Sequence, residues 1–157
     1  MALKAGSKAP AFSLPNQDER KINLKDYSGQ WVVLYFYPKD NTSGCTLEAQ
    51  EFTKAVRDFE KLGAVILGVS ADTTKSHMNF VEKKGLGINL LSDTEKNMLK
   101  KYDTWKLKKM AGKEYMGIVR TTYLINPMGK IAEVWDKVKA KGHAKEVLDK
   151  LTELKGG

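Results

Sequence analysis

The hydrophobic positions of this chain group into continuous runs and helical repeats. Residues 31–37 form an unbroken apolar run, which predicts a strand covered on both faces. Beyond a polar segment, apolar residues recur every three or four positions: Ala49, Phe52, Val56, Phe59 and Leu62. This spacing predicts one buried face of a helix, and Gly63 predicts its end. A second apolar run over residues 65–69 predicts another buried strand.

Shorter signals complete the chain. Residues 73–84 predict a helix that ends at Gly85, and a short helix opens at Asp93, whose side chain can cap it. Strands over 121–125 and 130–135 flank an Asn-Pro-Met-Gly turn, which predicts a hairpin.

The ends of the chain and one internal segment carry further expectations. The polar stretch 16–21 joins two apolar patches and predicts an N-terminal hairpin, and residues 142–154 predict a final helix. Residues 104–119 show no clear period and predict a long loop near the site.

The order of these elements indicates the fold class. Strand, helix, strand and helix are followed by a hairpin and a helix, which predicts an α/β layered fold with helices on both faces of the sheet. The 157 residues, 41% of them hydrophobic, suffice for one core, so we expect a single domain over residues 1–157.

The charge distribution raises one alternative class. The net charge is +8, and residues 96–120 hold seven lysines and one arginine against two acids. A basic patch is compatible with nucleic-acid binding. The segment has three aromatic residues and no nucleic-acid-binding motif, so we interpret it as a solvated lysine-rich loop and expect no nucleic-acid partner.

Cysteine use and hydropathy bear on location. The single cysteine excludes a disulfide within the chain, so nothing calls for an oxidising compartment. No apolar run approaches the ~18 residues that span a membrane, and residues 1–10 lack the apolar core of a signal peptide. We expect a cytoplasmic protein with no membrane partner.

The single cysteine, Cys45, is expected where the strand over 31–37 passes through a loop into the first turn of a helix. There the free backbone N–H groups and the positive end of the helix dipole stabilise an anion. A thiolate is such an anion, so this position favours an ionised, nucleophilic cysteine. The alternative is an inert buried cysteine.

The residues around Cys45 favour the nucleophile. Pro38, Thr42 and Cys45 follow the pattern Pro-x-x-x-Thr-x-x-Cys, which resembles the peroxidatic motif of peroxiredoxins. Residues 36–49 as a whole resemble the peroxiredoxin Q group, also called bacterioferritin comigratory protein. Further segments resemble that group in order along the chain: 9–15, 67–72 with 76–77, 120–125 and 138–143.

This resemblance implies a thioredoxin-like fold with a central mixed sheet and an N-terminal hairpin. It implies a thiol-dependent peroxidase that reduces hydrogen peroxide and organic hydroperoxides through a cysteine sulfenic acid. Cys45 would attack the peroxide, Thr42 would bond the thiolate or the peroxide, and Arg120 would offer its donor fork to sulfur and oxygen. Pro38 would shape and dry the pocket, and the backbone N–H groups of Gly44 and Cys45 would act as an oxyanion hole.

Other polar residues allow two interpretations. Glu48 is either a helix-surface acid or an orienter of Arg120, and the resemblance favours the second. Thr42 can also serve as a helix cap. His77 and His143 are too isolated in the sequence to support a base or a metal role, and we expect no metal and no cofactor. Tyr37, Trp105 and Met110 either line the pocket or pack in the core, and we expect core packing for each.

The sequence departs from the peroxiredoxin Q pattern at two places. Many members of the group carry a resolving cysteine where this chain has Gln50, and others carry it near residues 80–81, where this chain has Phe-Val. A one-cysteine mechanism follows, with thioredoxin, glutaredoxin or a small thiol as external reductant and a monomer or weak dimer as the expected state. Ser43 replaces the usual proline, and as a good cap it should preserve the loop.

Two other functions compete with a peroxidase. One is a non-catalytic thioredoxin-fold binding module in which Cys45 is structural, although such a module has no reason to combine Thr42, Cys45 and Arg120. The other is a disulfide oxidoreductase of the thioredoxin type. It requires Cys-x-x-Cys, and Glu48 occupies the position of the second cysteine.

Overall fold

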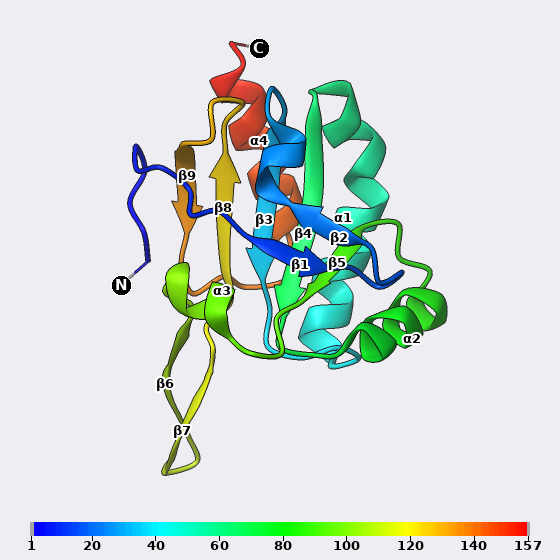
Figure 1. Ribbon diagram of the computed structural model, residues 1–157, viewed down its shortest axis with the longest axis vertical. Helices are drawn as coiled ribbons and strands as arrows, with labels where there is room; N and C mark the ends of the chain where they lie inside the picture. The colour runs from blue at the N-terminus through cyan, green and yellow to red at the C-terminus, as the bar shows by residue number, and fades with distance from the viewer. Residues whose placement is uncertain (1, 157) are drawn as a thin grey trace.

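A five-stranded mixed sheet forms the centre of the computed structural model, which describes residues 2–156 (Figure 1). Its strand order is β5-β4-β3-β8-β9. The strands are β3 (Trp31–Phe36), β4 (Ala64–Ser70), β5 (Asn89–Ser92), β8 (Thr121–Ile125) and β9 (Ile131–Trp135). β3, β4 and β5 run parallel, whereas β8 is antiparallel to β3 and β9 is antiparallel to β8. The predicted strands and the mixed sheet are confirmed.

Helices cover the two faces of the sheet unequally. One face packs against α1 (Ser43–Lys61), α2 (Thr74–Lys84) and α4 (His143–Leu154). The other is covered by α3 (Asn97–Lys101), the 3₁₀ turn η1 (Leu24–Tyr27) and the hairpin of β1 (Ser13–Pro15) and β2 (Lys21–Asn23). Figure 1 shows α3 and the β1–β2 hairpin in front of the sheet and α1 and α4 behind it. The predicted N-terminal hairpin is therefore confirmed.

Alternate residues of β3 enter two separate cores. Val33 and Tyr35 belong to the cluster under α1 and α4, whereas Val32, Leu34 and Phe36 belong to the cluster under α3 and the N-terminal hairpin. All five are at most 1% exposed. Because side chains of a strand point alternately to opposite faces, burial on both faces explains the unbroken apolar run of the sequence.

The helix ends follow the sequence signals. Gly63 has a φ of 73°, and Gly85 caps α2 with a φ of 62°, a conformation that costs glycine little. The short helix α3 begins at Asn97 rather than directly after Asp93. The Asp93 carboxylate nevertheless accepts the backbone N–H of Leu99 at 2.8 Å, so it still binds the start of the helix.

The predicted loop over residues 104–119 is wrong. These residues form an antiparallel hairpin of β6 (Trp105–Met110) and β7 (Lys113–Ile118). Ala111 and Gly112 make the turn with φ angles of 52° and 79°, as two-residue hairpin turns require. Figure 1 shows the hairpin projecting from the end of the molecule where α1 begins.

The hairpin lacks the alternation of polar and apolar residues because it has little buried surface. Leu107 is 57% exposed and Met110 is 66% exposed, so the expectation that Met110 packs in the core is also wrong. Trp105, at the base of the hairpin, packs partly against the core, and Tyr37 is buried. Among the described helices, none has the length and apolar content to cross a membrane.

Candidate active site

Cys45 is the third residue of α1, and its side chain is free and buried, with 1% of the residue exposed. Thr42 holds the N-cap position, but its side chain makes no hydrogen bond to the helix. A helix leaves its first N–H groups without intrahelical acceptors, and Thr42 does not supply one. The N–H groups of Ser43, Gly44 and Cys45 thus place positive partial charge in the helical turn that carries the thiol.

Arg120 contacts the sulfur directly. Its Nη2 donates to Cys45 Sγ at 3.3 Å, and its Nη1 donates to Glu48 Oε1 at 2.6 Å. The register of the sheet explains this contact. Phe36, the last residue of β3, pairs with Thr121, the first residue of β8, so Arg120 lies beside the loop that leads into α1.

Glu48 lies about one turn of α1 after Cys45 and is fully buried, so it is not a helix-surface acid. Burial raises the pKa of Glu48 to about 7, although Arg120 opposes that shift. Burial alone would lower the pKa of Arg120, but Glu48 and Cys45 outweigh this effect and hold the Arg120 pKa above its usual value. The guanidinium is therefore charged and held between a carboxyl group and a sulfur.

Gly44 allows the guanidinium to approach. A Cβ atom at this position would lie 3.3 Å from Nη2 of Arg120, closer than nearly all real Cβ contacts. Because Gly44 has no side chain, the guanidinium of Arg120 can lie next to it. The backbone of Gly44 also lies next to the thiol of Cys45.

Thr42 is exposed and donates its hydroxyl hydrogen to the backbone carbonyl of Lys39 at 2.9 Å. A hydroxyl group has one hydrogen. Toward the pocket Thr42 can therefore only accept a hydrogen bond, which suits the O–H of a peroxide and does not suit a thiolate. Pro38 is half-buried in the same loop.

Ser43 is the first residue of α1 and not its cap, so the expectation for this residue is wrong in detail. Proline is favoured at the first helical position because its missing N–H is not needed there. The helix forms with serine in place, so the loop survives the substitution as expected.

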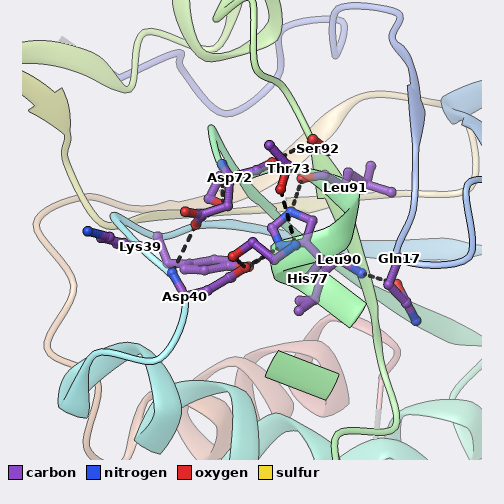
Figure 2. A network of polar contacts seen from close by, with 12 residues as sticks. Gln17, Lys39, Asp40, Asp72, Thr73, His77, Leu90, Leu91 and Ser92 are labelled. Carbon is purple, nitrogen blue, oxygen red and sulfur yellow. Dashed lines mark hydrogen bonds and ion pairs between the residues drawn. The ribbon is translucent and has the colours of Figure 1, made fainter. Parts of the chain in front are cut away.

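A buried polar network behind the loop was missed by the sequence analysis. It joins Asp40, Asp72 and His77, from the loop, the end of β4 and the start of α2 (Figure 2). These three residues have the spacing of metal ligands. However, both oxygens of Asp40 and both ring nitrogens of His77 already make hydrogen bonds within the protein. The only signal in the sequence was that all three residues lie in segments that resemble peroxiredoxin Q.

His143, the other histidine, begins α4. Its Nε2 lies 2.7 Å from the Thr122 hydroxyl and its Nδ1 lies 2.8 Å from Glu146. Burial lowers the pKa of His143, against the effect of Glu146. It packs edge-on against Phe52 and Trp135, which describes a core histidine with satisfied nitrogens.

Comparisons with known proteins agree with this geometry. Residues 5–134 match the AhpC/TSA family. Peroxiredoxin Bcp of Bacillus subtilis is 46% identical over 154 residues, which cover 98% of each chain. This chain belongs to the AhpC/TSA family. Within that family it is a peroxiredoxin of the Bcp and peroxiredoxin Q group, and its only cysteine fits a one-cysteine peroxidase.

Solved structures of the group show the same fold. Peroxiredoxin Q of Xylella fastidiosa superposes with a TM-score of 0.93 at 40% identity, covering 98% of both chains. A bacterioferritin comigratory protein of Xanthomonas campestris superposes with a TM-score of 0.89 at 40% identity, covering 96% of this chain and 98% of the other. The thioredoxin-like fold is thereby confirmed.

Proposed function

We propose that this peroxiredoxin reduces hydrogen peroxide and organic hydroperoxides at Cys45. The contact between Arg120 and the Cys45 sulfur, beside the free N–H groups of α1, carries this assignment. The thiolate attacks one peroxide oxygen and the O–O bond breaks. The other oxygen takes a proton and leaves as water or an alcohol, while Cys45 becomes a sulfenic acid.

Each neighbour of Cys45 has a distinct role in this step. Arg120 stabilises the thiolate and the negative charge that develops on oxygen, since its fork presents several donors in one plane. Thr42 accepts the O–H of the bound peroxide, because its own hydrogen is donated to Lys39. Gly44 supplies a backbone N–H group and room for the guanidinium. Pro38 shapes and dries the pocket.

Glu48 acts through Arg120 rather than on the substrate. Its 2.6 Å hydrogen bond fixes Nη1 of Arg120 and thereby aims Nη2 at the sulfur. Its full burial and its contact with Arg120 support a positioning role.

The substrate range rests on similarity as well as on geometry. The Xanthomonas campestris structure was determined in connection with alkyl peroxide reduction activity by that protein. Because the two chains share 40% identity over nearly their full lengths, we extend organic hydroperoxides to this chain.

The second half of the cycle needs a thiol from outside the chain, because Cys45 is the only cysteine. A thiol attacks the sulfenic acid, water leaves, and a mixed disulfide forms. A second thiol releases Cys45 as a thiol and leaves with the first as a disulfide. Thioredoxin, glutaredoxin or a small thiol fits this role, with the protein acting as a monomer or weak dimer.

Location and domain organisation complete the proposal. A supply of reduced thiols is a property of the cytoplasm, so we assign the protein there. The family match over residues 5–134 and the continuous central sheet support one domain over residues 1–157.

A coupled assay tests the proposal. Purified protein is mixed with hydrogen peroxide and dithiothreitol, and peroxide loss is followed for the wild type, Cys45→Ser and the matched control Ser43→Ala. We expect turnover in the wild type and the control and none in Cys45→Ser. Dimedone labelling of Cys45 after peroxide alone identifies the sulfenic acid. Turnover in Cys45→Ser would exclude the proposed chemistry and favour a structural cysteine in a binding module.

A further inference from the structure

Asp40 ties the active-site loop to the start of α2. It lies two residues before Thr42 and is 5% exposed. Its Oδ1 accepts the hydroxyl of Tyr37 at 2.6 Å, and its Oδ2 accepts the hydroxyl of Ser76 at 2.8 Å. Burial raises the pKa of Tyr37 well above its usual value, so Tyr37 stays a donor.

His77 makes a third contact to Asp40. The imidazole is fully buried, with Nε2 2.9 Å from the carbonyl of Leu91 and Nδ1 2.7 Å from Asp40 Oδ2. A carbonyl can only accept, so Nε2 carries a hydrogen. If Nδ1 carried none, its lone pair would face a carboxylate oxygen. A hydrogen therefore lies between Nδ1 and Asp40 Oδ2, and this contact joins His77 to Asp40 beside the contacts of Tyr37 and Ser76.

The peptide bond between Lys39 and Asp40 links the network to Thr42. The N–H of Asp40 donates to Asp72 Oδ2 at 2.9 Å, and the carbonyl of Lys39 accepts the Thr42 hydroxyl at 2.9 Å. Both groups belong to one planar unit. A shift of its N–H end therefore moves the acceptor that orients the Thr42 hydroxyl. Asp72 is itself held by the hydroxyl of Ser70 at 2.7 Å.

The loop needs such support because of its backbone. Asn41, between Asp40 and Thr42, has a φ of 64°, in the left-handed region that non-glycine residues seldom adopt. Contacts that fix the Lys39–Asp40 peptide bond, one residue earlier, help to hold the loop in this conformation.

We propose that Asp40, Asp72 and His77 are positioning residues for the peroxide step, and that they act by orienting the Thr42 hydroxyl. This inference rests on the proposed function. None of the three touches the sulfur. Arg120 and the N–H groups of α1 stabilise the thiolate, and neither depends on the Lys39–Asp40 peptide bond. Loss of the network should therefore slow the reaction with peroxide more than a reaction that needs only a thiolate.

The ratio of two rate constants measures this difference. Each protein is reacted with hydrogen peroxide and, separately, with iodoacetamide at the same pH. Partial unfolding or a changed thiolate fraction alters both rates, whereas misplacement of Thr42 alters only the first. For Asp40→Ala we expect the ratio of peroxide rate to alkylation rate to fall about 10-fold or more. If Asp40→Ala does not fold, Asp72→Ala tests the same proposal, because it removes the acceptor of the Asp40 N–H.

Two further variants separate the positioning of Thr42 from general effects of removing an acidic residue. Asp40→Asn keeps an acceptor for Tyr37, and its amide can donate to Nδ1 of a neutral His77, so we expect the ratio to recover to within about 3-fold of the wild type. Asp58→Ala removes an exposed acid of α1 and should leave the ratio unchanged.

The outcomes are distinct. An unchanged ratio in Asp40→Ala and Asp72→Ala, with peroxide turnover intact in the wild type, would overturn the positioning role alone. Equal losses of the peroxide rate and the alkylation rate would show that the network contributes to stability and not to positioning. Absence of any peroxide reaction in the wild type would instead overturn the proposed function.

Discussion

Nη2 of Arg120 lies 3.3 Å from the sulfur of Cys45, although 75 positions separate the two residues in the chain. The same guanidinium is held by the buried carboxyl group of Glu48. The guanidinium of Arg120 thus contacts both the sulfur of Cys45, a potential nucleophile, and the carboxyl group of Glu48, whose burial affects its protonation. The site is therefore sensitive to the shape of the arginine, to the space around it and to pH.

Replacement of Arg120 should impair chemistry more than folding. In Arg120→Lys the charge persists but the planar fork is lost, so one group no longer reaches both Glu48 and the sulfur. We expect the peroxide rate constant to fall about 100-fold, which corresponds to ~3 kcal/mol and matches the loss of an oxyanion donor. Stopped-flow tryptophan fluorescence measures the rate, and thermal unfolding provides the control. A rate within a few-fold of the wild type would argue against the role.

Glu48 should make stability depend on pH. Its pKa is raised from 4.5 to about 7 in the folded protein, so between these values the folded state binds more protons than the unfolded chain. The stabilising contribution of protonated Glu48 is present in full below pH 4.5 and is lost as the pH rises through about 7.

The variant Glu48→Gln removes this titration. The difference in unfolding free energy between variant and wild type should shift in favour of the variant by up to ~3 kcal/mol between about pH 5 and pH 8. Urea unfolding at several pH values measures it. The pKa of His143 is lowered, so its titration makes stability rise with pH in the wild type and in the variant alike. The difference in unfolding free energy between the two proteins removes this contribution. Parallel pH curves would contradict the prediction.

Gly44→Ala should have opposite effects on stability and activity. Alanine favours a helix over glycine by up to ~1 kcal/mol, whereas its Cβ would lie 3.3 Å from Nη2 of Arg120 and press on the guanidinium. We expect an unchanged or raised melting temperature and a peroxide rate reduced by about 10-fold. Ser43→Ala is the matched control, since position 43 already carries a Cβ. Equal peroxide rates in the two variants would show that Arg120 adjusts without cost.

Oxidation without reductant should leave Cys45 unpaired. Neither Gln50 nor Val81 offers a thiol, so low peroxide should give the sulfenic acid, and higher peroxide the sulfinic and sulfonic acids. Intact-protein mass spectrometry distinguishes these species by the number of added oxygens, and dithiothreitol should reverse only the first. A disulfide-linked dimer as the main product at low peroxide would show that a second chain resolves Cys45.

Much of the architecture was predictable because it depends on local pattern. The run over residues 31–37 identifies β3 through burial on both faces, and the helical repeat after Cys45 identifies α1. The place of Cys45 at the start of that helix follows from the same two signals. By contrast, the β6–β7 hairpin was not predicted, because a hairpin exposed on both faces shows no alternation of polar and apolar residues.

The tertiary structure alone decided how the site is assembled. Sequence resemblance pointed to Arg120, but the pairing of Phe36 with Thr121 is what brings it to Cys45. Register between distant strands depends on the packing of the whole sheet, and no local periodicity records it. The contact between Asp40 and His77 could not be predicted for the same reason. The two residues come from separate elements, and their side chains meet only when the sheet and α2 are packed. The sequence by itself determined which apolar runs form the buried strands and where Cys45 lies, whereas the fold determined which polar groups face one another.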